Sequence, residues 1–307
     1  MAINKTMRIA LKALSYPDLD IKKNYKLHRQ VNAAVNAYLK PRYSIWDHRI
    51  AGLDRDIPVR IFFPPDTSDD IPQRVLVFFH GGGWVIGNID SYSNVCVNMA
   101  RQTGAMVVSV DYRLAPEHRF PCALEDCYTV TREIFLDSTL FDVEKDNIIL
   151  IGDSAGGNLA AAVSMLARDR GEFSIPKQIL IYPSTSNDHS DETGFLSIRE
   201  FGQEYLLTSK RIRDYMDMYI SSEEDLNNPY LAPLIAKDLS KQPKTLIITA
   251  EYDPLRDEGE AYGKKLAEHG NTVDIYRMRD ALHGFFSLPK HFVHVKRSYE
   301  LINRFLR

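Results

Sequence analysis

The chain has 307 residues, of which 44% are hydrophobic and 26% charged, and its formal net charge at pH 7 is −3. These values are typical of a globular protein that is long enough for one large α/β domain with additions, or for two domains. A charge this small gives no reason to expect nucleic acid or an anionic membrane as a partner. No run approaches the roughly 18 consecutive apolar residues of a membrane span. The first residues lack the apolar core of a secretory signal, so we expect a cytoplasmic protein.

The three cysteines, Cys96, Cys122 and Cys127, are too few and too irregularly spaced for a disulfide framework or a zinc site. All three fall on predicted helix faces, where a free thiol behaves as a small apolar side chain. We therefore expect three buried thiols, a reducing compartment and no metal.

The first 40 residues are predicted to be helical, because they contain no strand pattern. The second helix carries one apolar stripe and is expected to end before Pro41. A stripe of this kind predicts packing over another part of the protein, although a plain structural arm is an equal alternative. Its members are Leu27, Val31, Ala34, Val35 and Tyr38.

The rest of the chain predicts an α/β protein with a mostly parallel, eight-stranded sheet flanked by helices. Two short strands of partly alternating polarity come first and are typical of an antiparallel margin. Six apolar strands then alternate with helices, except between residues 184 and 229. The predicted domains are an N-terminal helical cap (1–45), a core (46–183 and 230–307) and a cap insertion (184–229). Strands are expected over 44–50, 58–63, 75–79, 106–110, 148–151, 178–182, 245–249 and 273–278.

One serine stands at a predicted strand-to-helix corner, in Gly152-Asp153-Ser154-Ala155-Gly156. The backbone of such a corner is strained, and any side chain at 152 or 156 would collide with neighbouring elements. The corner exposes the Ser154 hydroxyl and turns the Ala155 amide toward negative charge that forms beside it. A G-x-S-x-G pentapeptide alone is weak evidence, because glycine–serine turns are common. Its place between a strand and a helix makes Ser154 a candidate nucleophile.

A serine needs a base, and reactive groups in open α/β sheets gather at the carboxyl ends of strands. Asp253 and His283 each follow a predicted strand, and the order Ser, Asp, His is that of α/β-hydrolases. The chain has nine histidines, so the alternative for His283 is a loop residue that caps a helix or bonds a carbonyl. Glu251 and Asp257 compete with Asp253, but Asp257 is typical of an acidic residue in the first turn of a helix.

Three successive glycines follow the strand 75–79, in His80-Gly81-Gly82-Gly83-Trp84. Glycine is costly in backbone entropy, so three in a row need a reason. One is an oxyanion hole, in which bare amides approach a carbonyl oxygen. The other is a phosphate cradle, which we disfavour because no Gly-Lys-Ser/Thr follows. His80 itself is predicted to be structural and to bond the loop backbone.

Taken together, five motifs resemble the hormone-sensitive-lipase-like family of α/β-hydrolases, and more narrowly its microbial carboxylesterases with a Gly-Asp-Ser-Ala-Gly elbow. The resemblance runs from about Val75 to Phe286 and shows no departure at a catalytic position. The motifs are His80-Gly81-Gly82-Gly83, Asp111-Tyr112-Arg113-Leu114-Ala115-Pro116-Glu117, Gly152-Asp153-Ser154-Ala155-Gly156-Gly157, Asp253-Pro254-Leu255-Arg256-Asp257-Glu258-Gly259 and His283-Gly284-Phe285.

The resemblance implies an esterase of small-molecule esters with no cofactor. Because the predicted cap is small and lacks a long apolar cleft, we expect a preference for short acyl chains. It implies Ser154 as nucleophile, His283 as general base and then acid, and Asp253 as the residue that orients His283. The amides of Gly82, Gly83 and Ala155 would form the oxyanion hole, and residues 111–117 a structural buttress. The predicted pocket floor, for which plain core packing is an equal alternative, consists of Trp84, Tyr182 and Phe285.

Three alternatives remain open on the same fold. One is a ligand receptor, against which the retained Ser154, Asp253 and His283 argue; another is a lyase that uses the oxyanion site without acylation. The third is an amidase or peptidase, which no residue distinguishes from an esterase. By analogy with the family, the last strand (273–278) would pair two copies of the chain into a homodimer.

Overall fold

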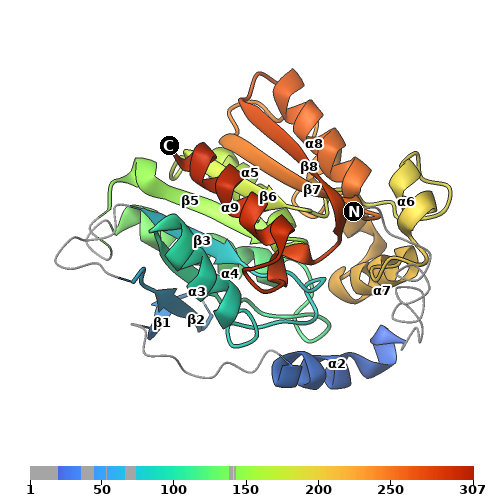
Figure 1. Ribbon diagram of the computed structural model, residues 1–307, viewed down its shortest axis with the longest axis horizontal. Helices are drawn as coiled ribbons and strands as arrows, with labels where there is room; N and C mark the ends of the chain where they lie inside the picture. Colours follow the sequence, from blue (N-terminus) through green and yellow to red (C-terminus); the bar gives the residue numbers. More distant parts are fainter. Residues whose placement is uncertain (1–19, 36–44, 53, 66–73, 138–140, 142) are drawn as a thin grey trace.

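The computed structural model describes residues 20–35, 45–52, 54–65, 74–137, 141 and 143–307 (Figure 1). They form an eight-stranded sheet in the order β1-β2-β4-β3-β5-β6-β7-β8. The β1–β2 and β2–β4 pairs are antiparallel and all other pairs are parallel, which confirms the predicted architecture. The strands are β1 Ile45–Ala51, β2 Asp56–Phe62, β3 Val75–Phe79, β4 Met106–Val110, β5 Ile148–Asp153, β6 Lys177–Ile181, β7 Lys244–Tyr252 and β8 Val273–Leu282.

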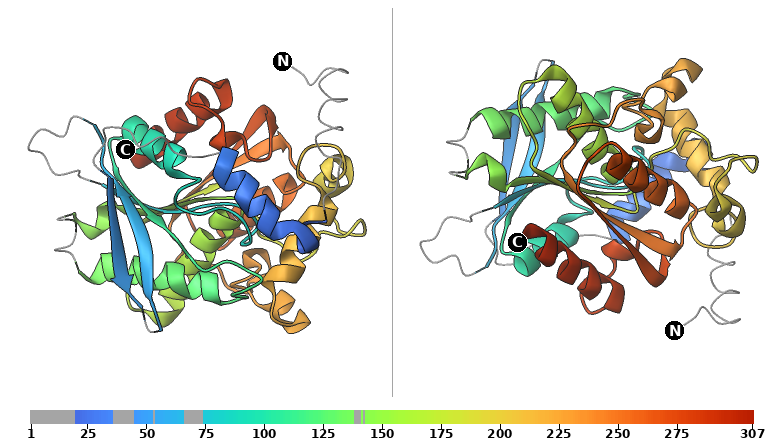
Figure 2. Two further views of the ribbon diagram at one scale, coloured as in Figure 1. Left: turned by 90° about the horizontal axis from the view of Figure 1, so that it is seen from below. Right: turned by 90° about the horizontal axis from the view of Figure 1, so that it is seen from above.

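Helices cover both faces of the sheet (Figure 2). β3 shows why its five residues are all apolar: its side chains alternate between two core layers. Val75, Val77 and Phe79 pack in the layer of α4, α5 and α8, whereas Leu76 and Phe78 pack in the layer of α3 and α9. The helices of these layers are α3 Ser93–Thr103, α4 Cys122–Leu136, α5 Ala155–Arg170, α8 Arg256–Glu268 and α9 Val293–Leu306.

Helices outside the two layers gather at one end of the sheet, where the loop after β5 lies (Figure 1). α2 packs against α7, and Lys22 of α2 forms an ion pair with Asp217 of α7. The predicted division into core and cap stays a prediction. The helices that gather at this end are α2 Ile21–Val35, α6 Leu196–Phe201 and α7 Ser209–Tyr219. The short 3₁₀ helices of the described chain are η1 Lys145–Asn147, η2 Glu223–Asn227, η3 Pro233–Ile235 and η4 Phe285–Ser287.

The buried side of α2 is not the predicted stripe. Leu27 and Val31 are 50% and 53% exposed, and Ile21 is the buried apolar residue. The contact of α2 with the segments around Val85 and Ala115 is instead polar. Arg29 donates hydrogen bonds from Nε to the Val85 carbonyl (2.7 Å) and from Nη2 to the Ala115 carbonyl (2.8 Å). Leu27 and Val31 lie on the opposite side of the helix from Arg29 and face outward. The other members of the stripe have side chains outside the described residues.

The expectation of three buried thiols is wrong for one of them. Cys96 and Cys127 are buried, but Cys122 is half-buried. Cys122 is the first residue of α4, where the side chain lies at the end of the helix and reaches solvent. No helix within the described ranges combines the length and the apolar character needed to cross a membrane.

Candidate active site

The site is built on the corner between β5 and α5. Ser154 has φ 55° and ψ −119°, a strained conformation for a residue with a side chain, and its amide donates to the Ile181 carbonyl at 2.9 Å. A Cβ atom at Gly156 would lie 1.9 Å from the Phe79 carbonyl oxygen, so the helix can approach the sheet this closely only with glycine. The sequence therefore forces the chain to turn sharply at Ser154.

The structure brings His283 and Asp253 to this corner. His283 Nε2 lies 2.9 Å from Ser154 Oγ, and His283 Nδ1 lies 2.7 Å from Asp253 Oδ2. Asp253 is completely buried and its Oδ1 accepts a hydrogen bond from the Leu255 amide at 2.9 Å. The His283 side chain is 12% exposed. Three residues from the ends of β5, β7 and β8 thus form one continuous chain of polar contacts.

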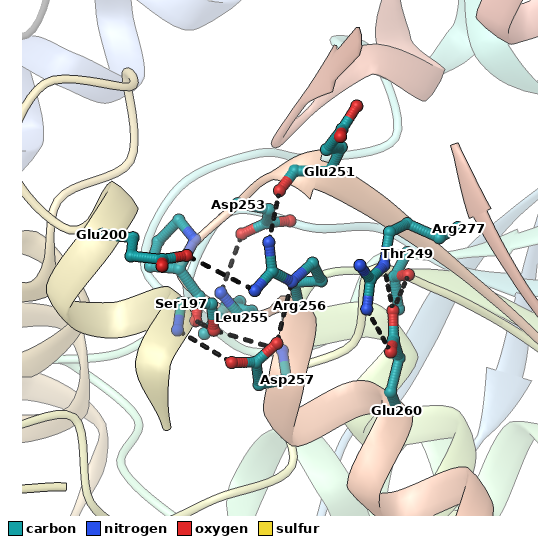
Figure 3. Close-up of polar contacts among 11 residues, drawn as sticks. Ser197, Glu200, Thr249, Glu251, Asp253, Leu255, Arg256, Asp257, Glu260 and Arg277 are labelled. Carbon is teal, nitrogen blue, oxygen red and sulfur yellow. Dashed lines mark hydrogen bonds and ion pairs between the residues drawn. The ribbon is translucent and has the colours of Figure 1, made fainter. Parts of the chain in front are cut away.

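The two carboxylates that compete with Asp253 have other partners, and Figure 3 shows those of Asp257. Glu251 Oε2 accepts a hydrogen bond from the Asp280 amide at 2.7 Å. Asp257, in the first turn of α8, accepts from the Ser197 amide at 2.8 Å and pairs with Arg256. Neither carboxylate bonds the His283 ring.

The glycine loop lies beside Ser154 and against α7. Gly83 has φ +60°, and a Cβ atom there would lie 2.4 Å from the Tyr215 ring of α7. Gly82, Gly83 and Ala155 line one cavity together with Ser154. Within the described residues, their amides donate no hydrogen bond. The structure therefore leaves unpaired donors next to the serine hydroxyl, as an oxyanion hole requires.

His80, the first residue of the glycine loop, is fully buried and takes no part in this array. Burial lowers the pKa of His80 to about 4, so its ring is neutral at physiological pH. The ring stacks on Tyr112 with centroids 4.3 Å apart, and Nδ1 lies 2.8 Å from the Gly81 carbonyl oxygen. Tyr112 comes from the segment expected to act as a buttress and donates to the His80 carbonyl at 2.7 Å.

Asp153 is a residue of the site that sequence reasoning missed. It is buried, and its carboxylate accepts hydrogen bonds from the Gly81 amide (2.8 Å), the Tyr92 hydroxyl (3.2 Å) and the Tyr182 hydroxyl (3.4 Å). Burial nevertheless dominates and raises the pKa of Asp153 to about 6. The signal was present as a carboxylate next to the nucleophile in an otherwise apolar run, but its partners come from distant segments.

The cavity over Ser154 has a volume of about 240 Å³. Trp84 lines it as expected, but Tyr182 and Phe285 do not. Both lie underneath: the Tyr182 ring packs on His283 at 4.7 Å and on Phe285 at 5.2 Å. The sequence did not point to several lining residues between 206 and 215, because their positions depend on how this segment folds back over Ser154. These are Leu206, Leu207, Arg211, Ile212 and Tyr215.

A strained serine at a strand-to-helix corner, joined to a histidine and a buried carboxylate, is the arrangement of an α/β-hydrolase. The family model for the alpha/beta hydrolase fold matches residues 76–287. The chain is 37% identical over 245 residues to an arylesterase of Saccharolobus solfataricus, covering 80% of this chain and 78% of the relative. It is 38% identical over 247 residues to esterase LipI of Mycobacterium tuberculosis, covering 80% and 76%.

Among solved structures, the chain resembles the hyperthermophilic esterase of the archaeon Pyrobaculum calidifontis with a TM-score of 0.86. The two chains are 33% identical, and the match covers 100% of this chain and 98% of the other. The chain belongs to the hormone-sensitive-lipase-like family of α/β-hydrolases. It is a carboxylic ester hydrolase of the serine esterase type.

Proposed function

We propose that Ser154 is the nucleophile, His283 the general base and then acid, and Asp253 the residue that orients His283, in the hydrolysis of small esters with short acyl chains. The observation that carries this proposal is the pair of distances, 2.9 Å from Ser154 Oγ to His283 Nε2 and 2.7 Å from His283 Nδ1 to Asp253 Oδ2. A base within hydrogen-bonding distance of the nucleophile, itself oriented by a third group, meets the geometric requirement for nucleophilic catalysis.

The reaction proceeds in two halves. Ser154 Oγ attacks the ester carbonyl carbon while His283 Nε2 takes the hydroxyl proton. The C–O bond to the alcohol then breaks and His283 gives that proton to the leaving oxygen, which leaves an acyl group on Ser154. Water repeats the cycle: His283 removes its proton, the water oxygen attacks the acyl carbon, and the proton returns to Ser154 Oγ as the acid departs.

Negative charge on the carbonyl oxygen is stabilised by the amides of Gly82, Gly83 and Ala155. Ala155 begins α5, a helix of 16 residues, so the positive end of the helix dipole adds to its amide. Donors aligned before the reaction are worth roughly 10²–10³ in turnover for each donor in other hydrolases. The unpaired state of these three amides supports this assignment.

A Ser154→Ala variant tests the nucleophile. We expect it to fold like the wild type, because alanine fits the corner, and to lose hydrolysis of p-nitrophenyl acetate. An organophosphate should add its mass to the wild type and not to the variant, which also separates acylation from lyase chemistry. Ser174→Ala is the matched control, since Ser174 is exposed beyond the far end of α5. Substantial hydrolysis by Ser154→Ala would rule out the assignment.

Pairing of two copies through β8 also stays a proposal. β8 is an edge of the sheet, and the exposed backbone groups of an edge strand are able to pair with a second copy.

A further inference from the structure

Arg211 places a positive charge in the wall of the catalytic cavity. It lies in the first turn of α7, one helical turn before Tyr215, and both residues line the cavity that contains Ser154. Apolar side chains make up most of the adjacent cap wall, namely Leu206, Leu207 and Ile212. A guanidinium in such surroundings loses hydration and needs a partner to compensate.

The partners that the protein supplies to Arg211 are few. Nη1 donates a hydrogen bond to the Leu206 carbonyl at 3.1 Å. Nε is buried and has no hydrogen-bond partner, and within the described residues no carboxylate lies within ion-pairing distance of the guanidinium. The preceding residue differs: Lys210 pairs with Asp214 at 2.7 Å. The described residues therefore supply no carboxylate to the Arg211 guanidinium, although Arg211 lines the cavity.

Nearby titratable groups do not neutralise this charge. Burial lowers the pKa of His28, and the charge of Arg211 lowers it further, so this ring is neutral. Burial raises the pKa of Tyr215 to about 12, so its hydroxyl is neutral too. Asp153 is the carboxylate in the cavity wall, but it accepts hydrogen bonds from the Gly81 amide and from two tyrosine hydroxyls. The positive end of α7 adds to the potential.

We propose that this enzyme hydrolyses esters that also carry a carboxylate, and that the guanidinium of Arg211 binds this carboxylate. A guanidinium carries N–H groups in a fixed planar arrangement that matches the two oxygens of a carboxylate. The inference rests on the proposed function, because it assumes that the scissile ester lies at Ser154.

A purely structural role for Arg211 makes a different prediction. If the side chain served only to hold the Leu206 carbonyl, its loss would change the hydrolysis of charged and neutral esters alike. The ratio of the two rates therefore distinguishes binding of the substrate from support of the loop.

The experiment compares kcat/KM for each charged ester with that for its neutral amide isostere. On the acyl side the probes are the monoethyl esters of succinate, glutarate and adipate, each against the ester whose free carboxylate is replaced by a carboxamide. On the alcohol side they are 3-acetoxypropanoate and 3-acetoxypropanamide. Arg211→Met removes the charge at similar length, Arg211→Lys keeps it, and Lys210→Met is the control for loss of a neighbouring cation.

We expect the wild type to prefer the charged ester in at least one series, and Arg211→Met to lower that ratio roughly 10- to 100-fold. Arg211→Lys should lie between them, and Lys210→Met should keep the wild-type ratio. Because each ratio is internal to one protein sample, partial misfolding of a variant cancels. A ratio that is the same in wild type and Arg211→Met in both series overturns the inference while leaving the esterase intact; no hydrolysis of any ester would instead reject the proposed function.

Discussion

At the scale of single residues, Asp153 is a buried carboxylate in the site that takes no part in the proposed reaction. Its carboxylate holds the Gly81 amide and thereby anchors the glycine loop to the nucleophile corner. The same burial that makes this anchor rigid raises the pKa of Asp153 to about 6, from an ordinary value of 3.8. Folding therefore favours the protonated form of this carboxyl group.

This shift gives stability a defined pH dependence. A carboxylic acid whose folded-state pKa is above its unfolded value binds its proton more tightly in the native protein, so its contribution is greatest at low pH and is lost as pH rises from about 4 to about 6. The rise in the pKa of Asp153 from 3.8 to about 6 corresponds to a difference of about 3 kcal/mol in the free energy of unfolding. We expect the free energy of unfolding of Asp153→Asn, relative to wild type, to be higher at pH 7 than at pH 4 by about that amount.

Chemical denaturation at pH 4, 5, 6 and 7 measures this difference. Asp191→Asn is the control for removing a carboxylate from the surface, because Asp191 is exposed. If the difference between Asp153→Asn and wild type were constant across this range, the buried charge would not be the cause.

At the scale of elements, the ends of β7 and β8 decide whether the histidine meets its carboxylate. Both strands run beyond their predicted limits, to Tyr252 and Leu282. The pairing register of the two strands shifts between Ala250 and Tyr252. At this irregularity the Glu251 carboxylate accepts a hydrogen bond from the Asp280 amide. Because of this bulge, the residues that directly follow the two strands, Asp253 and His283, lie side by side.

A clamp between α6 and the start of α8 holds the turn after Asp253 (Figure 3). Ser197 Oγ donates to the Pro254 carbonyl at 2.8 Å, and the Ser197 amide donates to Asp257 at 2.8 Å. Ser197 is completely buried, so its removal leaves a buried carbonyl unpaired. The clamp ties α6 to the backbone that carries the proposed orienting carboxylate.

We expect Ser197→Ala to lower the free energy of unfolding by about 1–3 kcal/mol. Since a misplaced Asp253 affects the reacting geometry more than substrate binding, kcat for p-nitrophenyl acetate should fall roughly 3- to 10-fold with KM nearly unchanged. Urea denaturation and steady-state kinetics measure the two effects. Ser190→Ala, in the same insertion, is the control; wild-type stability in Ser197→Ala would show that the clamp does not contribute.

At the scale of the whole molecule, α7 packs on the glycine loop and leaves a cavity of about 240 Å³ over Ser154. Typical pockets for drug-sized ligands are larger, on the order of 300–1,000 Å³. The volume is therefore suited to small esters.

We expect kcat/KM for p-nitrophenyl esters to peak between C2 and C6. Each methylene adds up to about 0.8 kcal/mol of binding until the cavity is full, after which longer chains have to displace the cap. Hydrolysis rates of esters from C2 to C16 measure this dependence on chain length. Leu207→Ala enlarges the cavity, because Leu207 lines it, and should move the peak to longer chains. Faster hydrolysis of C12–C16 than of C2–C6 would contradict the limit that a small cavity sets.

Much of this architecture was predictable from local patterns. Unbroken apolar runs such as Val75–Phe79 read as strands covered on both faces, and glycine–serine geometry located the corner at Ser154. Periodicity misled at α2, where it selected the Leu27 and Val31 side, because an apolar stripe does not reveal that Arg29 finds backbone carbonyls on the opposite side. The predicted pocket floor differs for a similar reason. Tyr182 and Phe285 do not line the cavity, because an aromatic side chain packs as readily beneath a site as in its wall.

By itself, the sequence determined the α/β sheet, the sharp turn at Ser154 and the identity of the residues able to do acyl chemistry, because strand periodicity and glycine requirements are local properties of the chain. Only the tertiary structure decided which of three carboxylates faces His283, what surrounds Asp153, and that Arg211 enters the cavity. Each of these depends on segments that are far apart in the chain, and their contacts are fixed by the bulge in β7 and β8 and by the fold of the insertion, neither of which any local pattern encodes.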